Sequence, residues 1–293
     1  MSMLSYVEAF IDEAEQRCPS DPKDFGDILP HLRRLGLDDF GSVFWSMPNS
    51  RYPRLSQLLP KMASEEVQRN WTGNSGERLL VQSCAFVRSV AFNFTQLTHR
   101  PLRGRSILDF GCGYGRLARL MYYFANVDDL VGVDPWDESI RLCHQAGMGD
   151  NFLLSDYLPR SLPVGERRFD LIFAFSVLTH LSERTAVLTL STLADYLRDD
   201  GVLAITIRPV EYWYADVHAK EQGLVETQIR SHHSRGFSFL PHRRDFIEGE
   251  ITYGDTSLSP EWLEHNAPKL RIRALDRSLE DPMQIQVYLS RRG

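Results

Sequence analysis

Residues 107–116 read Ile-Leu-Asp-Phe-Gly-Cys-Gly-Tyr-Gly-Arg, and this stretch carries the clearest structural signal in the chain. A short apolar run carries an acid, Asp109, and opens directly into a loop with glycine at every second position. Apolar residues from Leu117 onward then follow a helical spacing. Because glycine has no Cβ, such a loop can adopt positive φ angles and let a ligand approach its backbone. The stretch therefore predicts a strand, a ligand-binding loop and a helix in succession.

Two classes of ligand use a loop of this kind. The dinucleotide pattern is G-x-G-x-x-G, but Arg116 stands where its third glycine belongs. The glycines instead alternate as G-x-G-x-G, beginning two residues after Asp109. This arrangement resembles motif I of the class I S-adenosylmethionine (SAM)-dependent methyltransferases, D/E-x-G-x-G-x-G. The resemblance implies that SAM is bound by these residues of the strand and loop: Asp109, Gly111, Cys112, Gly113 and Gly115.

Acids also follow the next two apolar runs. Val131–Asp134 is expected to form a second strand, and the resemblance implies that Asp134 binds the ribose hydroxyls of SAM. Trp136 could pack against adenine or cover the start of the next helix. After the apolar run 151–154, Asp156 either contacts the adenine amino group, as the family implies, or caps a turn.

The fourth predicted strand, Phe169–Ser176, is apolar nearly throughout, as expected for a strand covered on both faces. It resembles motif IV of the family, which implies that Ser176 lies beside the cofactor. Ser182 is then a suitable N-cap for a helix that runs to about Asp199 and ends at Gly201. Residues 202–207 form the fifth predicted strand.

The alternation of strands and helices over residues 105–207 predicts a parallel sheet with helices on both faces. Ser259 and Pro260 mark another helix start, followed by strands at 270–275 and 284–289. Their connection is too short for a parallel crossover, so the two should pair antiparallel. The fold expected from the resemblance is α/β, a seven-stranded, mostly parallel, Rossmann-like sheet with an antiparallel last strand and an N-terminal helical cap.

Two parts are expected along the chain. Residues 1–100 form a mainly helical cap or lid, and residues 101–293 form the SAM-binding core. Within the first part, Trp71 lies in a polar turn and could either close over SAM or anchor two helices. The core carries an insertion, 209–258, at a place where the family varies to recognise acceptors.

The insertion combines aromatic residues and acids with clustered arginine and histidine. This composition suits a sugar, a phosphate or a carboxylate, or else a solvated flap. Phe237–Leu240 and Ile251–Tyr253 are expected to form a short β pair. The spacing of the histidines matches no standard ligand pattern, so no metal site is predicted.

Methyl transfer to an oxygen of high pKa benefits from a general base. His180, just after the fourth strand, and His218, in the insertion, are the candidate catalytic residues. The structural alternative for His180 is a role in packing or capping before the next helix. The residues after the fourth strand lack the N/D/S-P-P-Y/F pattern of enzymes that methylate amino groups of nucleic acid bases.

The bulk composition narrows the partners. A net charge of −6 argues against binding nucleic acid mainly through its phosphates. Four cysteines without a CxxC pair favour reduced thiols and a cytoplasmic location. We find no secretory signal, and no apolar run approaches the length of a membrane span. The oligomeric state is not indicated.

The sequence thus predicts a SAM-dependent methyltransferase of bacterial type that acts on a small-molecule or glycan or lipid-linked acceptor, at oxygen. One alternative is an NAD-dependent Rossmann oxidoreductase, which Arg116 and the reversed last strand oppose. Another is a SAM-binding partner subunit without catalytic activity, which retains the same loop and differs only in turnover.

Overall fold

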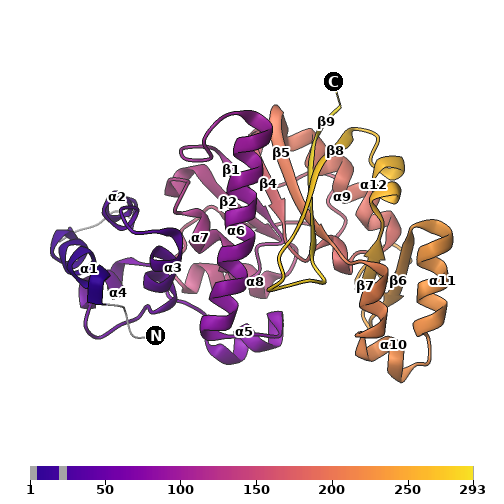
Figure 1. Cartoon of the computed structure of the whole chain (residues 1–293), viewed down its shortest axis with the longest axis horizontal. Coiled ribbons are helices and arrows are strands. Elements are labelled where there is room, and N and C mark those ends of the chain that lie inside the picture. The colour runs from indigo at the N-terminus through magenta and orange to yellow at the C-terminus, as the bar shows by residue number, and fades with distance from the viewer. Residues whose placement is uncertain (1–4, 20–24, 293) are drawn as a thin grey trace. The chain divides into compact units, whose positions relative to one another are not determined.

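The computed structural model describes residues 5–19 and 25–292 (Figure 1). The chain divides into two compact units. The N-terminal unit comprises Met1–Thr95 and Arg100–Leu154, and the C-terminal unit comprises Gln96–His99 and Ser155–Gly293. The functional division at residue 100 expected above stays a prediction.

One sheet has seven strands in the order β3-β2-β1-β4-β5-β9-β8. In the N-terminal unit, β1 (Ile107–Phe110) pairs in parallel with β2 (Leu130–Asp134), which pairs in parallel with β3 (Phe152–Leu154). Every residue of β1 and β2 is buried, as expected for strands covered on both faces. The three strands predicted from residues 107–154 are therefore present.

The C-terminal unit contains the reversed strand. Here β4 (Phe169–Ala174) pairs in parallel with β5 (Leu197–Ile207). The last strand, β9 (Ile285–Arg291), runs antiparallel to both β5 and β8 (Leu270–Arg277). The expectation of a seven-stranded, mostly parallel sheet with an antiparallel last strand is confirmed.

The helices of the N-terminal unit surround an aromatic core. Phe25 contacts Tyr122 edge to face at 4.8 Å between ring centroids, and Phe40 contacts Tyr123 at 5.3 Å. Rings in this geometry stabilise a core beyond the area that they bury. The helical segments of this part are α1 (Ser5–Arg17), η1 (Phe25–Ile28), α2 (Leu29–Leu32), α3 (Leu37–Trp45), α4 (Pro53–Leu58), α5 (Glu65–Thr72), α6 (Gly76–Thr98), α7 (Arg116–Met121), η2 (Val127–Asp129) and α8 (Asp137–Gln145).

The helices of the C-terminal unit begin where the sequence indicates. The Ser182 side chain accepts a hydrogen bond from the Thr185 amide, and the Ser259 side chain accepts one from the Trp262 amide. The helical segments are η3 (Leu178–His180), α9 (Glu183–Tyr196), η4 (Val210–Tyr214), α10 (Val217–Glu221), α11 (Val225–Arg235) and α12 (Pro260–Asn266).

The predicted end of α9 is wrong. The helix stops at Tyr196, because Leu197 is already extended and pairs with Phe169 of β4. Gly201 lies within β5 and does not cap the helix. A Cβ at Gly201 would stand 2.9 Å from the Asp170 carbonyl oxygen, so the glycine is explained by this close approach of two backbones.

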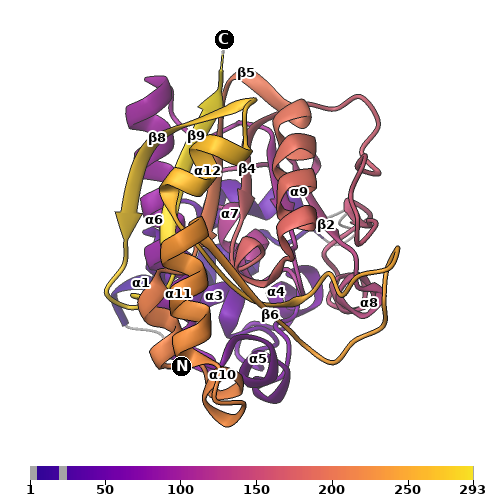
Figure 2. The same cartoon turned by 90° about the vertical axis from the view of Figure 1, so that its right-hand side faces the viewer.

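The insertion forms a small antiparallel hairpin covered by a helix. Strand β6 (Phe237–Pro241) pairs with β7 (Gly254–Leu258), which begins just after the predicted 251–253. Figure 2 shows α10 and α11 grouped with this hairpin. Buried side chains hold the group together: Trp213, Ala219, Ile229 and Leu240. None of the helices described over residues 5–19 and 25–292 is long and apolar enough to cross a membrane.

Candidate functional site

The glycine loop of the N-terminal unit connects β1 to α7. Gly111, Gly113 and Gly115 all have positive φ, at 76°, 54° and 74°. At Gly115 a Cβ would also come within 2.8 Å of the buried Met148 side chain. The amides of Gly111 and Cys112 donate to the Val133 carbonyl at 2.8 and 3.1 Å, which ties the loop to the end of β2. Backbone conformation therefore favours glycine at all three positions, and packing against Met148 also requires it at Gly115.

Asp134 fixes the same loop from the end of β2. One carboxylate oxygen accepts from the Gly113 amide and the other accepts from the Trp136 amide, each at 2.9 Å. Burial raises the pKa of Asp134, and the two backbone hydrogen bonds oppose that rise. Each oxygen keeps further acceptor capacity, so a pair of vicinal hydroxyl groups could bind there.

Asp109 in β1 is a buried acid with an unsatisfied oxygen. The residue is 2% exposed, and its Oδ2 has no hydrogen-bond partner among the described residues. Burial raises the pKa of Asp109 well above its ordinary value, and the charge of Arg116 opposes this rise. Such a carboxyl group fits a cationic ligand such as the α-ammonium of an amino acid, because the ligand would supply the missing partner.

Two predicted tryptophans meet beside the loop. Trp71 lies in the last turn of α5 and not in the predicted polar turn. Its ring stacks on that of Trp136, with centroids 4.6 Å apart and planes at 25°. Trp71 also lies 3.8 Å from the position that a Cβ on Gly113 would occupy, and it contacts Tyr114 edge to face. The N-terminal unit thus brings together a helix of the expected cap, the glycine loop and the segment after β2.

The other two predicted cofactor residues lie in the C-terminal unit. Asp156 is exposed. The hydrogen bond to Glu248 raises the pKa of Arg160, and the charge of Asp156 adds a smaller contribution to that rise. Ser176 follows β4 with φ of 58°, a conformation that costs energy for a residue other than glycine. Its hydroxyl lies 3.1 Å from that of Thr179 and accepts from Gln284 Nε2 at 3.0 Å. A strained serine in a hydrogen-bonded network at the end of a strand is typical of a ligand-binding position.

His180 is held on both sides of its ring. Its Nδ1 lies 2.8 Å from the Gly254 carbonyl, which only a protonated nitrogen can satisfy, so Nε2 accepts from Arg208 at 3.1 Å. Burial first, and the Arg208 charge second, lower the pKa of His180 to about 3. The ring also stacks on Tyr253 at 5.0 Å. These contacts agree with the alternative in which His180 has a packing role.

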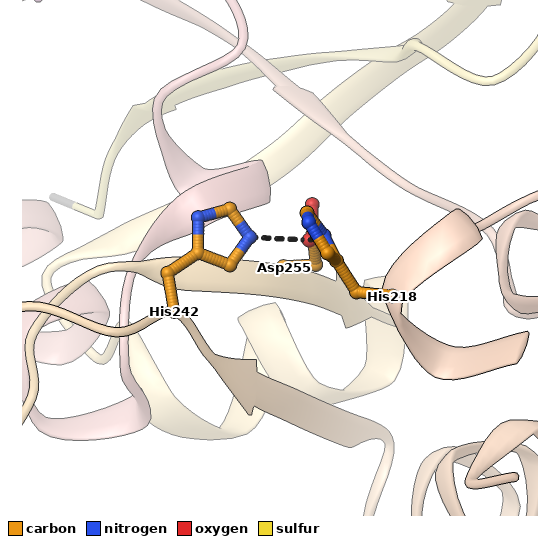
Figure 3. A group of neighbouring side chains, drawn as sticks. All are labelled: His218, His242 and Asp255. Atoms are coloured by element: carbon orange, nitrogen blue, oxygen red, sulfur yellow. Dashed lines mark hydrogen bonds and ion pairs between the residues drawn. The ribbon is translucent and has the colours of Figure 1, made fainter. Parts of the chain in front are cut away.

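Asp255 of β7 joins both predicted catalytic histidines, and sequence reasoning missed it. Its Oδ1 binds Arg208 Nη1 at 2.7 Å and lies 3.8 Å from His180 Nδ1. Its Oδ2 lies 2.6 Å from His242 Nε2 and 3.5 Å from His218 Nδ1 (Figure 3). Burial would raise the pKa of Asp255, but His242 and Arg208 hold it well below its ordinary range.

No sequence signal indicated this cluster. Asp255 follows an irregular segment and belongs to no recognised motif, and Arg208 stands at the end of a strand where a charge usually faces solvent. Only the pairing of β6 with β7 brings His242 next to Asp255. His242 belongs to the clustered arginine and histidine residues of the insertion, and its position in the sequence does not identify its partner.

A family model described as a methyltransferase domain matches residues 82–244, more than half of the chain. The chain belongs to this methyltransferase family. The predicted membership of the class I SAM-dependent methyltransferases, with SAM as the cofactor that the family uses, is confirmed. The match does not support the alternative of an NAD-dependent oxidoreductase.

Two curated relatives of this methyltransferase family member match part of the chain. A tRNA U34 carboxymethyltransferase from Aeromonas hydrophila is 32% identical over 124 residues, covering 40% of this chain and 36% of the relative. A ubiquinone biosynthesis O-methyltransferase from Sinorhizobium fredii is 28% identical over 108 residues, covering 36% and 42%. The chain therefore spans less than half the length of the curated relatives that it matches.

A solved methyltransferase structure is similar in fold to this chain over most of its length. The plantazolicin methyltransferase BpumL, in complex with SAH, aligns over 90% of this chain and 98% of its own, with a TM-score of 0.52. The two sequences are 13% identical, so the similarity shows the shared methyltransferase fold and not a shared acceptor.

Proposed function

We propose that this chain is an enzyme that transfers a methyl group from SAM to an oxygen atom of a small-molecule, glycan or lipid-linked acceptor. The observation that supports it most strongly is the corner of the N-terminal unit, where Asp109 keeps an unpaired buried oxygen beside a glycine loop anchored by Asp134. SAM supplies an electrophilic methyl group on a sulfonium, whose departure as a thioether needs no protonation.

The residues of this corner have distinct tasks in the proposal. Asp109 binds the ammonium group of the methionine part, and Asp134 binds the ribose hydroxyls. The loop glycines admit the ligand to the backbone, and Trp71 and Trp136 offer aromatic surface for adenine. The full proposed set of cofactor residues is Asp109, Gly111, Cys112, Gly113, Gly115, Asp134, Trp136, Asp156, Ser176 and Trp71.

For the proton of the acceptor hydroxyl, His218 is the better of the two predicted bases. Both ring nitrogens of His180 are engaged, and Arg208 donates to its Nε2. The His218 side chain is 54% exposed, and its Nδ1 faces Asp255, so Nε2 is the nitrogen that takes the proton. A carboxylate behind an imidazole stabilises the imidazolium that then forms.

The remaining parts of the proposal concern recognition. Residues 1–100 act as a cap over the core 101–293, and the insertion 209–258 selects the acceptor. Oxygen as the methylated atom is supported by the histidine and carboxylate of the insertion, since a hydroxyl group must lose its proton to a base as it is methylated.

The test is methyl transfer from isotopically labelled SAM into a fractionated bacterial extract. Label in the small-molecule or glycolipid fraction supports the proposal and leads to the acceptor. Label confined to protein or nucleic acid contradicts the acceptor class. Calorimetry that shows binding of S-adenosylhomocysteine, together with no label in any fraction, would favour a non-catalytic SAM-binding subunit. Binding of NAD instead would contradict the cofactor assignment.

A further inference from the structure

Three side chains of the insertion converge from separate elements. His218 stands on α10, His242 directly follows β6, and Asp255 lies on β7. Each offers one ligand atom, and these three atoms all lie within 4.8 Å of one another (Figure 3). We infer that His218, His242 and Asp255 form a binding site for a divalent transition-metal ion of the zinc class.

The distances agree with this inference. Asp255 Oδ2 lies 2.6 Å from His242 Nε2 and 3.5 Å from His218 Nδ1. Zinc binds imidazole nitrogen and carboxylate oxygen at about 2.0–2.2 Å, which separates neighbouring ligand atoms by roughly 3.2–3.5 Å. The pair with His242 must open slightly, and His218, half exposed on a five-residue helix, can turn inward.

The carboxylate is already oriented for this task. Its Oδ1 accepts from Arg208 Nη1 at 2.7 Å and from the Tyr212 hydroxyl at 2.8 Å, which leaves Oδ2 directed at the histidines. The Tyr212 hydroxyl lies equally close, at 2.8 Å, to Asp216 Oδ2, so the two carboxylates share its proton. The Asp216 side chain caps α10 and so positions His218. Ligands held by such outer partners are typical of protein metal sites.

The ligand set selects the class of ion. Two imidazoles and one carboxylate suit zinc, cobalt, nickel or iron, whereas magnesium and calcium prefer oxygen ligands. Three protein ligands leave at least one coordination position open for water or an acceptor oxygen. The Arg208 charge opposes a dication, but it is paired with the other carboxylate oxygen.

This inference extends beyond methyl transfer, and it gives His218 a second state. A metal-bound His218 cannot accept the proton of an acceptor hydroxyl, so the ion and the proton compete for the same imidazole. The metal site can therefore be tested without SAM and without an acceptor. Its failure leaves the proposed methyltransferase function untouched, and the reverse also holds.

The test is a titration of the tag-free full chain, first treated with a chelator, with Zn²⁺ in calorimetry and with Co²⁺ in visible absorption. One equivalent should bind, and Co²⁺ should develop the d–d bands of a nitrogen and oxygen site. His218→Ala and His242→Ala should each weaken binding by more than about 100-fold, since loss of outer partners alone costs about 10–100-fold. Tyr212→Phe should fall within that smaller range.

His233→Ala is the matched control, because His233 is an exposed histidine of the same insertion. Its Zn²⁺ affinity should equal that of the unchanged protein. Because His218 is largely exposed, its replacement should leave the fold intact, which circular dichroism can verify. Absence of stoichiometric binding overturns the inference. So does binding that survives in both His218→Ala and His242→Ala.

Discussion

A buried carboxyl oxygen without a hydrogen-bond partner destabilises a folded protein, and Oδ2 of Asp109 is such an atom among the described residues. Its neighbours Gly111 and Cys112 make ordinary backbone hydrogen bonds, so the unsatisfied oxygen is not explained by local structure. We interpret it as a position whose partner arrives with the ligand. The stability of the ligand-free protein should then depend on the ionisation of Asp109.

The first prediction concerns pH and Asp109. Burial raises the pKa of Asp109 in the folded state. The stability that its protonated form provides is therefore fully present below the unfolded pKa of about 3.9 and is lost as pH rises through the folded pKa, because the buried carboxyl group must then ionise. The Asp109→Asn variant lacks this loss. The difference in the midpoint of thermal unfolding between Asp109→Asn and the unchanged ligand-free protein should therefore shift in favour of the variant as pH rises from about 4. Asp150→Asn, at an exposed acid, is the control and should follow the unchanged protein. Parallel curves for all three proteins would refute the burial argument.

The second prediction concerns Asp134. Replacement by alanine removes the acceptor for two backbone amides and, in the proposed assignment, for the ribose hydroxyls. We expect affinity for S-adenosylhomocysteine to fall by about 1–3 kcal/mol in titration calorimetry. Asp134→Asn keeps one acceptor oxygen and should lose less. Unchanged affinity in both variants would show that Asp134 does not contact the ligand.

At the scale of elements, the junction of β1, the glycine loop and α7 depends on backbone conformation. Gly115 is the N-cap of α7 and has positive φ, and its missing Cβ leaves room for Met148. Gly147 has a similar φ of 83°, but no atom lies within 4 Å of its absent Cβ. Substitution of Gly147 therefore tests conformational strain alone, whereas substitution of Gly115 tests strain together with packing.

The third prediction uses this pair. Gly147→Ala should cost about 1–2 kcal/mol of unfolding free energy, the ordinary penalty of the left-handed conformation. Gly115→Ala should cost a further ~1–3 kcal/mol, because Met148 is fully buried and has little space to move. Denaturant unfolding measures both. Equal losses would show that the Met148 contact is relieved by a small shift.

At the scale of the whole molecule, buried charge joins the insertion to the rest of the C-terminal unit. Arg208, at the end of β5, binds the Thr179 carbonyl at 2.8 Å and Asp255 of β7 at 2.7 Å. Both partners of the ion pair are largely buried, at 10% and 5% side-chain exposure. Residues far apart in the sequence are thus connected through one carboxylate.

The fourth prediction follows from that burial. Asp255→Asn leaves the Arg208 charge without its counterion and should destabilise the metal-free protein by about 3–5 kcal/mol. Asp199→Asn breaks a pair of similar length with Arg291, but Asp199 is 94% exposed, so little change is expected. Chemical denaturation compares the two variants. A small loss of unfolding free energy in Asp255→Asn would mean that water solvates the Arg208 guanidinium in place of the carboxylate.

The strands, the glycine loop, the N-caps Ser182 and Ser259 and the reversed last strand were all predictable from the sequence. These features depend on local chemistry: runs of apolar residues, glycine where φ is positive, serine where an amide needs an acceptor, and a connection too short to cross a sheet. The positions of Asp109 and Asp134 in strands that lead directly into loops were predictable for the same reason, whereas their contacts with a ligand remain predictions.

How the remaining residues combine follows from tertiary packing. Trp71 meets Trp136 because α5 packs beside the loop, and His218 meets Asp255 because β7 returns alongside β6. Gly201 marks a close approach of two strands, which looks like a helix end in the sequence. Contacts of this kind join segments distant along the chain, and no local preference of either segment specifies its partner.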